Sequence, residues 1–174
     1  MLTFHTKTAD GDTLYGRLVL PYEQREKCRL RARLEAGEEV AIFTARGTVL
    51  RGGDLLTGEN NLVVQIVAAQ EPTYAITCTG ARDLVRCAFH LGNRHTQVQV
   101  DAGLLRIRVD PVLRAMALGL GARVVEEQAV FEPEAGAYAS AGGGHSHGHG
   151  SDNHLLAPVP LRQKIHRPND PAPA

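Results

Sequence analysis

The sequence YAITCTGARDLVRCAFHLG, residues 74–92, decides the fold of the second half of this chain. Its first six residues have the composition of a β-strand. After them, apolar residues recur three and four positions apart, which is the spacing of an amphipathic helix. These apolar positions are Ala81, Leu84, Val85, Ala88 and Leu91. Because glycine favours helix C-termini, Gly92 predicts where the helix ends.

Two strands, a second helix and a last strand are predicted after this helix. Residues 96–100 and 104–109 read as strands separated by a turn at Ala102-Gly103. Asp110-Pro111 then predicts a helix start, because aspartate caps helix N-termini and proline fits the first helical position. The expected apolar stripe of this helix includes Val112, Met116 and Leu120. Residues 122–131 close the series, and the order β-α-β-β-α-β is typical of a ferredoxin-like fold.

The part of the chain before residue 70 has a different pattern. Short β-rich runs alternate with glycine turns there, and no helical period covers them. The expected strands are residues 14–20, 25–34, 40–43 and 62–67. The sequence therefore predicts an α+β protein, with an all-β domain over residues 1–72, a ferredoxin-like domain over 73–137 and a disordered Gly/His/Pro-rich tail over 138–174.

One expected strand, residues 25–34, has a basic face. Cationic residues alternate along it, so they lie on one side of a strand. They are Arg25, Lys27, Arg29, Arg31 and Arg33. Such a face is either solvated, docks another protein or binds RNA phosphates. Because no aromatic residue is interleaved for base stacking, we favour the first two interpretations.

The overall composition narrows the class of protein. The 174 residues carry 19 basic and 19 acidic side chains, so the chain has no general attraction for nucleic acid or anionic membranes. Neither a membrane-spanning apolar run nor an export signal is found, and we expect a cytoplasmic protein. Its three cysteines show no C-x-x-C spacing. Cys87 and His90 are spaced to form half a metal site, although a small buried hydrophobe beside a surface histidine is the favoured interpretation.

A histidine-rich segment follows the second domain. Residues 142–150 read GGGHSHGHG, with His145, His147 and His149 at alternate positions. Imidazole binds nickel, copper and zinc well, and glycine leaves the backbone free to wrap an ion and release it. The segment indicates a metal carrier, with His154 as a further candidate ligand and the role of His166 open. The alternative is a solvated low-complexity tail or a tag remnant.

A second candidate ligand lies at the end of the first predicted helix. Gly92 and Asn93 tolerate a left-handed backbone, so the turn can present His95 at the surface. A single histidine there is by default a hydrogen-bonded surface residue, and one imidazole is too few for a nickel site. In a two-fold dimer, however, His95 would meet its own copy, and tails from both subunits could complete the shell.

Three strings together resemble one family. They are RGTVLR at residues 46–51, HLGNRH at 90–95 and FEPEAGAY at 131–138. With the His-rich end, the chain resembles the UreE family of urease accessory proteins, which are nickel metallochaperones. The resemblance implies a partner-docking N-terminal domain and a homodimer whose interface nickel is held by the histidine matching His95. It also implies delivery to the urease apoprotein through a GTP-hydrolysing accessory protein.

The chain departs from this family in two ways. Its histidine tail is sparser than the long runs of other members, which argues against storage of many ions per dimer. Residues 108–111 lack the histidines that some relatives carry after the third strand of the metal domain, which argues against a secondary site there. Zinc and copper compete well for imidazole, so nickel preference would come from geometry, ligand number and supply.

Two alternatives to a carrier remain at this point. The first is an RNA- or ribosome-associated adaptor that uses the basic strand face. The second is an enzyme built on Cys87, His90 and His95. We favour a carrier that is not an enzyme.

Overall fold

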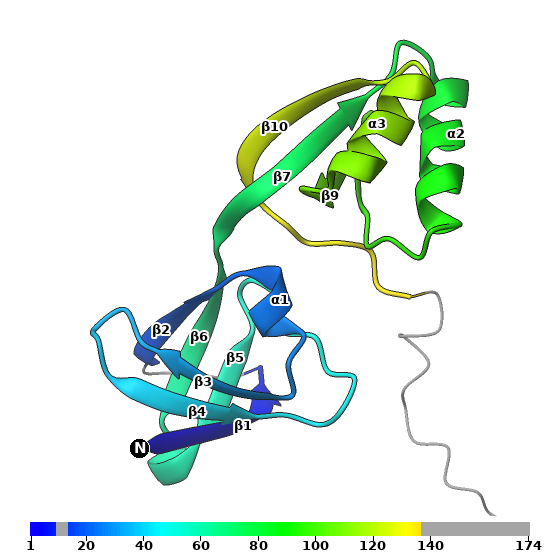
Figure 1. Ribbon diagram of the computed structural model, residues 1–174. Coiled ribbons are helices and arrows are strands. Elements are labelled where there is room, and N and C mark those ends of the chain that lie inside the picture. Colours follow the sequence, from blue (N-terminus) through cyan, green and yellow to red (C-terminus); the bar gives the residue numbers. More distant parts are fainter. Residues whose placement is uncertain (10–13, 137–174) are drawn as a thin grey trace, which may run out of the picture. The chain divides into compact units, whose positions relative to one another are not determined.

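The computed structural model describes residues 1–9 and 14–136, which form two β-sheets with helices (Figure 1). The expected tail over 138–174, with its candidate ligands, lies outside the described residues. The elements of the first sheet and its connections are β1 (Leu2–Thr8), β2 (Leu14–Leu20), α1 (Tyr22–Arg25), β3 (Arg29–Arg33), β4 (Glu39–Phe43), β5 (Leu55–Gly58), η1 (Glu59–Asn61) and β6 (Val63–Ala68).

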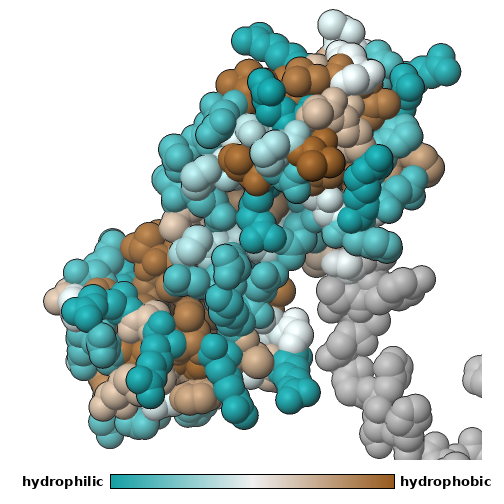
Figure 2. Space-filling view, viewed as in Figure 1, coloured by the Kyte–Doolittle hydropathy of each residue, from teal (hydrophilic) through white to brown (hydrophobic). Residues whose placement is uncertain are grey.

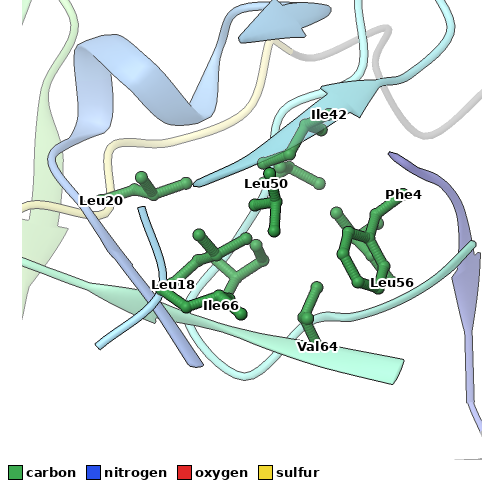
Figure 3. Packing of buried hydrophobic residues seen from close by; sticks show 10 residues of the cluster. Phe4, Leu18, Leu20, Ile42, Leu50, Leu56, Val64 and Ile66 are labelled. Carbon is green, nitrogen blue, oxygen red and sulfur yellow. The ribbon is translucent and has the colours of Figure 1, made fainter. Parts of the chain in front are cut away.

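The first sheet has the strand order β2-β6-β5-β1-β4-β3. The pairs β1–β4 and β2–β6 are parallel, while the others are antiparallel. Alternate residues of these strands face one apolar core (Figure 3). Its buried members are Phe4, Leu18, Leu20, Leu34, Val40, Ile42, Leu50, Leu56, Val64 and Ile66. The predicted strand 14–20 is confirmed, whereas β1 and β5 were not predicted.

The predicted strand over residues 25–34 is wrong in its first half. Arg25 ends the short helix α1 and is completely buried, and only Arg29–Arg33 form the strand β3. Lys27 lies between them and pairs with Glu23 at 2.9 Å. The five-residue basic face therefore reduces to Arg29, Arg31 and Arg33.

The second sheet has the strand order β10-β7-β9-β8, and all of its pairs are antiparallel. Its elements are β7 (Gln70–Thr77), α2 (Ala81–Gly92), β8 (Gln99–Asp101), β9 (Leu104–Arg108), α3 (Pro111–Gly119) and β10 (Arg123–Val130). This is the predicted β-α-β-β-α-β order, and the α+β fold class is confirmed. Figure 1 shows α2 and α3 against one face of this sheet.

A local signal in the sequence fixes where α3 begins. The carboxylate of Asp110 accepts hydrogen bonds from the N–H groups of Val112 and Leu113, at 2.8 and 3.0 Å, so it caps α3 as expected. The shared core of helices and sheet contains Tyr74, Ile76, Cys87, Leu91, Leu105, Ile107, Leu113, Ala117 and Ala122.

Three apolar residues assigned to the core stripes by their spacing are instead exposed: Ala81, Val85 and Val112. Val85 of α2 and Val112 of α3 are 68% and 73% accessible. In α3 it is Leu113 and Ala117 that face the sheet, one position away from the predicted stripe, together with the partly buried Met116 and Leu120. The face of α2 that carries Val85 therefore points into solvent.

Candidate metal site

His95 lies three residues beyond α2, in a turn whose backbone N–H groups bond to carbonyls of the last turn of the helix. The N–H groups of Asn93 and Arg94 donate to the carbonyls of Phe89 and Leu91, each at 3.0 Å. The His95 N–H then donates to the Gly92 carbonyl at 2.9 Å. This series of bonds ends the helix and turns residue 95 outward.

The left-handed residue of this turn is His95 itself, with φ of 53°. We expected Gly92 or Asn93 to take this role, but neither has a positive φ and Asn93 is right-handed at −63°. A left-handed backbone costs an L-residue about 1 kcal/mol. Histidine adopts this conformation more often than most other residues do. The imidazole of His95 is therefore exposed on a residue whose backbone conformation is unfavourable, as is often found at functional sites.

Two hollows meet at His95. The larger, of about 600 Å³, is lined by polar side chains that include Gln97, Arg108 and Asp110. The smaller, of about 420 Å³, is lined by Ala88 and Gly92 of α2, by Val100 and by Glu134. His95 therefore has a charged surface on one side and the flank of α2 on the other.

The flank of α2 beside His95 carries an exposed apolar stripe. Val85 and Phe89 are one helical turn apart and are 68% and 62% accessible, and Val100 of β8 is 51% accessible. Ala88 and Gly92 continue the same helix face into the smaller hollow. Figure 2 shows apolar surface on this module next to polar residues. We call Val85, Phe89 and Val100 the apolar stripe.

The other candidate residues of α2, Cys87 and His90, form no metal site within the part of the chain that the structure describes. Cys87 is fully buried in the core, which confirms its interpretation as a small hydrophobe. Burial, together with the Cys78 thiol 3.8 Å away, raises the pKa of Cys87 to about 11, so it stays a protonated thiol at neutral pH. His90 is half-buried and stacks edge-on against Phe89, with ring centroids 5.4 Å apart.

No group of three or more His, Cys, Asp or Glu side chains that could hold a metal ion occurs within residues 1–9 and 14–136. His95 is thus brought together with no second imidazole or thiolate of its own described chain. The other predicted ligands, His145, His147, His149 and His154, lie outside the described residues, as does His166.

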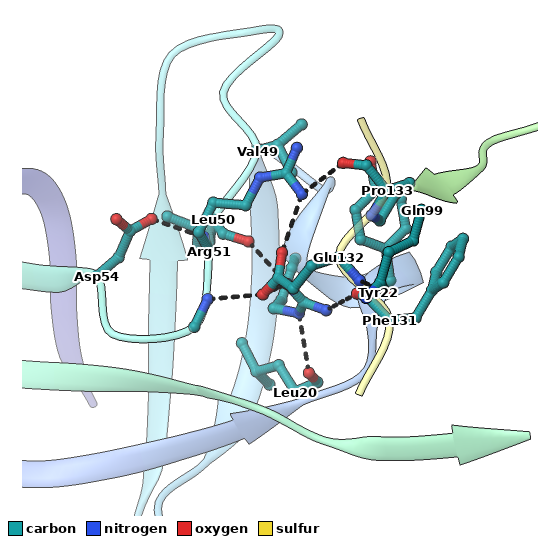
Figure 4. A network of polar contacts seen from close by, with 12 residues as sticks. Leu20, Tyr22, Val49, Leu50, Arg51, Asp54, Gln99, Phe131, Glu132 and Pro133 are labelled. Carbon is teal, nitrogen blue, oxygen red and sulfur yellow. Dashed lines mark hydrogen bonds and ion pairs between the residues drawn. The ribbon is translucent and has the colours of Figure 1, made fainter. Parts of the chain in front are cut away.

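A partly buried polar network, which no local sequence pattern indicates, holds the segment after β10. The Glu132 carboxylate accepts hydrogen bonds from Arg25 at 2.6 Å, from Arg51 at 2.9 Å and from the Gly52 N–H at 2.8 Å (Figure 4). Arg25, fully buried, also donates to the backbone carbonyls of Leu20, Leu50 and Phe131. We call Arg25, Arg51 and Glu132 the Glu132 clamp.

The clamp keeps Glu132 ionised. Burial opposes its ionisation, but the hydrogen bonds from Gly52, Arg51 and Arg25 outweigh burial and lower the pKa of Glu132. The charge on Arg25 is therefore compensated inside the protein, as a buried cation requires.

The clamp also fixes the path of the chain toward His95. Beyond the clamp, the Glu132 N–H donates to the Gln99 side chain at 2.8 Å and the Glu134 N–H donates to the Val98 carbonyl at 2.9 Å. Glu134 thereby lines the same hollow as His95. The last described residues before the histidine segment are thus held beside the candidate ligand.

No helix in the described parts of the chain is long and apolar enough to cross a membrane.

Comparison with known proteins covers both modules. Residues 4–69 match the family model of the UreE urease accessory protein N-terminal domain, and residues 71–155 match that of its C-terminal domain. The chain is 60% identical to the urease accessory protein UreE of Janthinobacterium sp. (strain Marseille), over 99% of both chains. It is 61% identical to UreE of Nitrosospira multiformis, over 98% of both, and 52% identical to UreE of Ralstonia nicotianae, over 84% of this chain and 70% of the relative. The resemblance drawn from three short strings is confirmed, and this chain belongs to the UreE family of urease accessory proteins, as an accessory protein and not an enzyme.

Proposed function

We propose that this protein is a nickel carrier that binds Ni(II) between two copies of its chain and delivers it for assembly of the urease active site. Nickel is here the cargo. The observation that carries the proposal is the exposed, left-handed His95 beside the apolar stripe.

A dimer solves two problems of the single chain at once. His95 alone leaves most coordination positions of a nickel ion empty, and the apolar stripe of the single chain is exposed to water. In a two-fold dimer the same surface of both copies meets, so each residue near the axis is present twice. Packing the stripes of two copies against each other would bury Phe89 and Val85 and supply two His95 imidazoles to one ion.

The histidine segment supplies further ligands in this proposal. His145 is nine positions after Gly136, and a chain of nine residues spans at most about 30 Å. Because Glu134 lines the hollow at His95, His145, His147, His149 and His154 are within reach of the same ion. Ligands from separate segments of the chain make a site that can be filled and emptied, which a carrier needs.

The remaining parts of the proposal concern partners and place. We propose that residues 1–72 form the partner-docking domain and residues 73–137 the metal-binding domain, with the tail from residue 138 onward. The expected recipients are the urease apoprotein and its GTPase accessory protein, in the cytoplasm. Zinc or copper is expected to occupy the site in vitro when nickel is absent.

Nickel titration by calorimetry, combined with light scattering, tests the proposal. His95→Ala is expected to remove the tightest nickel site of the dimer, whereas His5→Ala, which removes an exposed histidine of β1, keeps it. A chain ending at Ser140 is expected to keep the tight site and bind fewer ions in total. Undiminished tight binding by His95→Ala, or a particle of one subunit with nickel bound, would show the assignment to be wrong.

A further inference from the structure

The first sheet ends in an open edge at β3, which pairs with β4 and with no other strand of the described chain. The Thr44 N–H donates to the Cys28 carbonyl at 2.9 Å, and the Leu34 N–H donates to the Glu38 carbonyl at 2.8 Å. In an antiparallel pair the bonded residues alternate, so the even-numbered residues of β3 face β4. The N–H and C=O groups of Arg29, Arg31 and Arg33 therefore point away from the sheet.

The side chains of these three residues form the basic face that remains of the predicted one. Arg33 pairs with Glu39 at 2.7 Å, where both side chains are about two-thirds exposed. Arg29 and Arg31 are exposed and make no ion pair or hydrogen bond through their side chains within residues 1–9 and 14–136. Among the described residues, two cations without an ion-pair partner thus stand above a strand edge that no other strand covers.

Apolar surface flanks the same edge. Phe43, opposite Arg29 on β4, is 45% accessible, and a hollow of about 240 Å³ lies between Arg29, Arg31, Phe43 and Met1. On the inner face, Leu30 and Ala32 pack against the core of the first sheet but are only partly buried, because no further strand covers them. An added strand would cover them.

We propose that β3 binds an extended acidic segment of a partner protein as an additional strand of the sheet. The backbone of that segment would bond to residues 29, 31 and 33. Its acidic side chains, spaced about 6.8 Å apart at every second residue, would match the spacing of the arginines, and apolar residues between them would cover Leu30 and Ala32. A nucleic acid cannot continue a β-ladder, so the free edge favours a peptide over RNA. The proposal names the surface for the partner docking proposed above and rests on that part of the function.

The probe is a labelled peptide of about eight residues, the length of an ordinary strand, in which Glu and Val alternate. Binding to the full-length protein is measured by fluorescence anisotropy. Affinity is expected to weaken by roughly tenfold or more in Arg29→Glu/Arg31→Glu, since two favourable ion pairs become repulsive. The control Arg17→Glu/Arg114→Glu makes the same change of charge on β2 and α3 and is expected to bind as the unaltered protein does.

Two further measurements separate strand addition from simple charge attraction. N-methylation of the peptide amides that face β3 removes donors without changing charge, and it is expected to abolish binding. Amide hydrogen exchange is expected to slow at residues 29, 31 and 33 on peptide binding, while residues 30 and 32 are unchanged. Binding that is indifferent to N-methylation would overturn the proposal.

Two further binding results would contradict the proposal that β3 binds a peptide. If a uridine oligonucleotide binds and the peptide does not, the basic strand is an RNA site and the proposal is wrong. If neither binds, the edge arginines only keep the strand from pairing with other chains. Nickel titration of Arg29→Glu/Arg31→Glu separates this proposal from the metal site, because its nickel stoichiometry is expected to be that of the unaltered protein.

Discussion

Removing the acidic member of the Glu132 clamp is expected to destabilise the fold far more than removing an exposed glutamate. In Glu132→Ala, the fully buried Arg25 loses the carboxylate 2.6 Å away, its only anionic partner among the described residues. It keeps backbone carbonyls and the face of the Tyr22 ring, which carry no full charge. An uncompensated buried charge costs about 3–5 kcal/mol. The Gly52 N–H and the Arg51 guanidinium lose an acceptor as well.

The chain provides a matched control in the pair Arg33–Glu39. Its atoms are 2.7 Å apart, but both side chains are about 65% exposed. An exposed pair of this kind contributes about 0–1 kcal/mol because water solvates both charges when the pair is broken. Glu39→Ala is therefore expected to cost less than 1 kcal/mol, although the same side-chain atoms are removed and the ion pair has nearly the same length.

Urea unfolding followed by circular dichroism measures both variants. The expected loss of stability in Glu132→Ala corresponds to a melting temperature roughly 6–20 °C below that of the unaltered protein. Glu132→Gln is expected to lie between the two, because an amide oxygen still accepts from Gly52 but carries no charge. If Glu132→Ala and Glu39→Ala differ by less than about 1 kcal/mol, Arg25 is not an uncompensated buried cation in the variant and the reasoning fails.

Four further results are expected. Because the pKa of Glu132 is lowered in the folded state, its contribution to stability is complete above about pH 4.3 and is lost as the pH falls through the lowered value, so the gap between the unaltered protein and Glu132→Gln in urea unfolding closes in acid. The free energy of unfolding of His95→Gly is expected to be about 1 kcal/mol higher than that of His95→Ala, since glycine accepts a left-handed backbone. Calorimetry is expected to find the tight nickel site missing from both variants. Phe89→Asp, which puts a carboxylate on both sides of a two-fold interface, is expected to yield monomers in light scattering and to lose the tight site with His95 intact; a dimer with full nickel binding would place the interface elsewhere. Gly58→Ala is expected to lower stability by about 2 kcal/mol because its Cβ would clash with the Thr3 carbonyl, whereas Gly119→Ala, in open space on α3, leaves thermal stability unchanged or raises it.

The order of elements in the second module could be predicted because each boundary carries its own local signal. Asp110-Pro111 starts α3 and Gly92 ends α2, and neither depends on distant parts of the chain. The strands β1 and β5 were missed, since their place in the sheet depends on pairing with each other and with β4 and β6.

Arg25 shows why part of the structure could not be predicted from local pattern. It continues the alternation of cations through Arg33, yet it is buried against Glu132, which is 107 residues away in the chain. Periodicity contains no information on such a partner. Val85 failed for a related reason: α2 has apolar residues on more than one face, and only packing reveals which face meets the sheet.

For the candidate site, the residue types could be predicted from the sequence, but their arrangement in space could not. Its chemistry was visible in the sequence, because histidines next to glycines stand out whatever the fold. Its architecture was not, because the hollows at His95 join residues from α2, β8, β9 and the segment after β10. Glu134 follows directly after residues 131–133, which the clamp holds, and its own N–H donates to the Val98 carbonyl.

On the proposed function, the clamp and the candidate metal site are coupled through the path of the chain. Gly136 is two residues from Glu134, and His145 follows nine positions after Gly136, so in the proposed site the clamp fixes the point from which His145 would reach His95. A tethered ligand acts at an effective concentration that falls once its tether no longer matches the span. If the clamp is broken while the fold survives, His95 and the tail histidines are all still present, but the tail loses its fixed origin. On the proposed function, such a protein would keep the dimer site and lose the contribution of the tail to it.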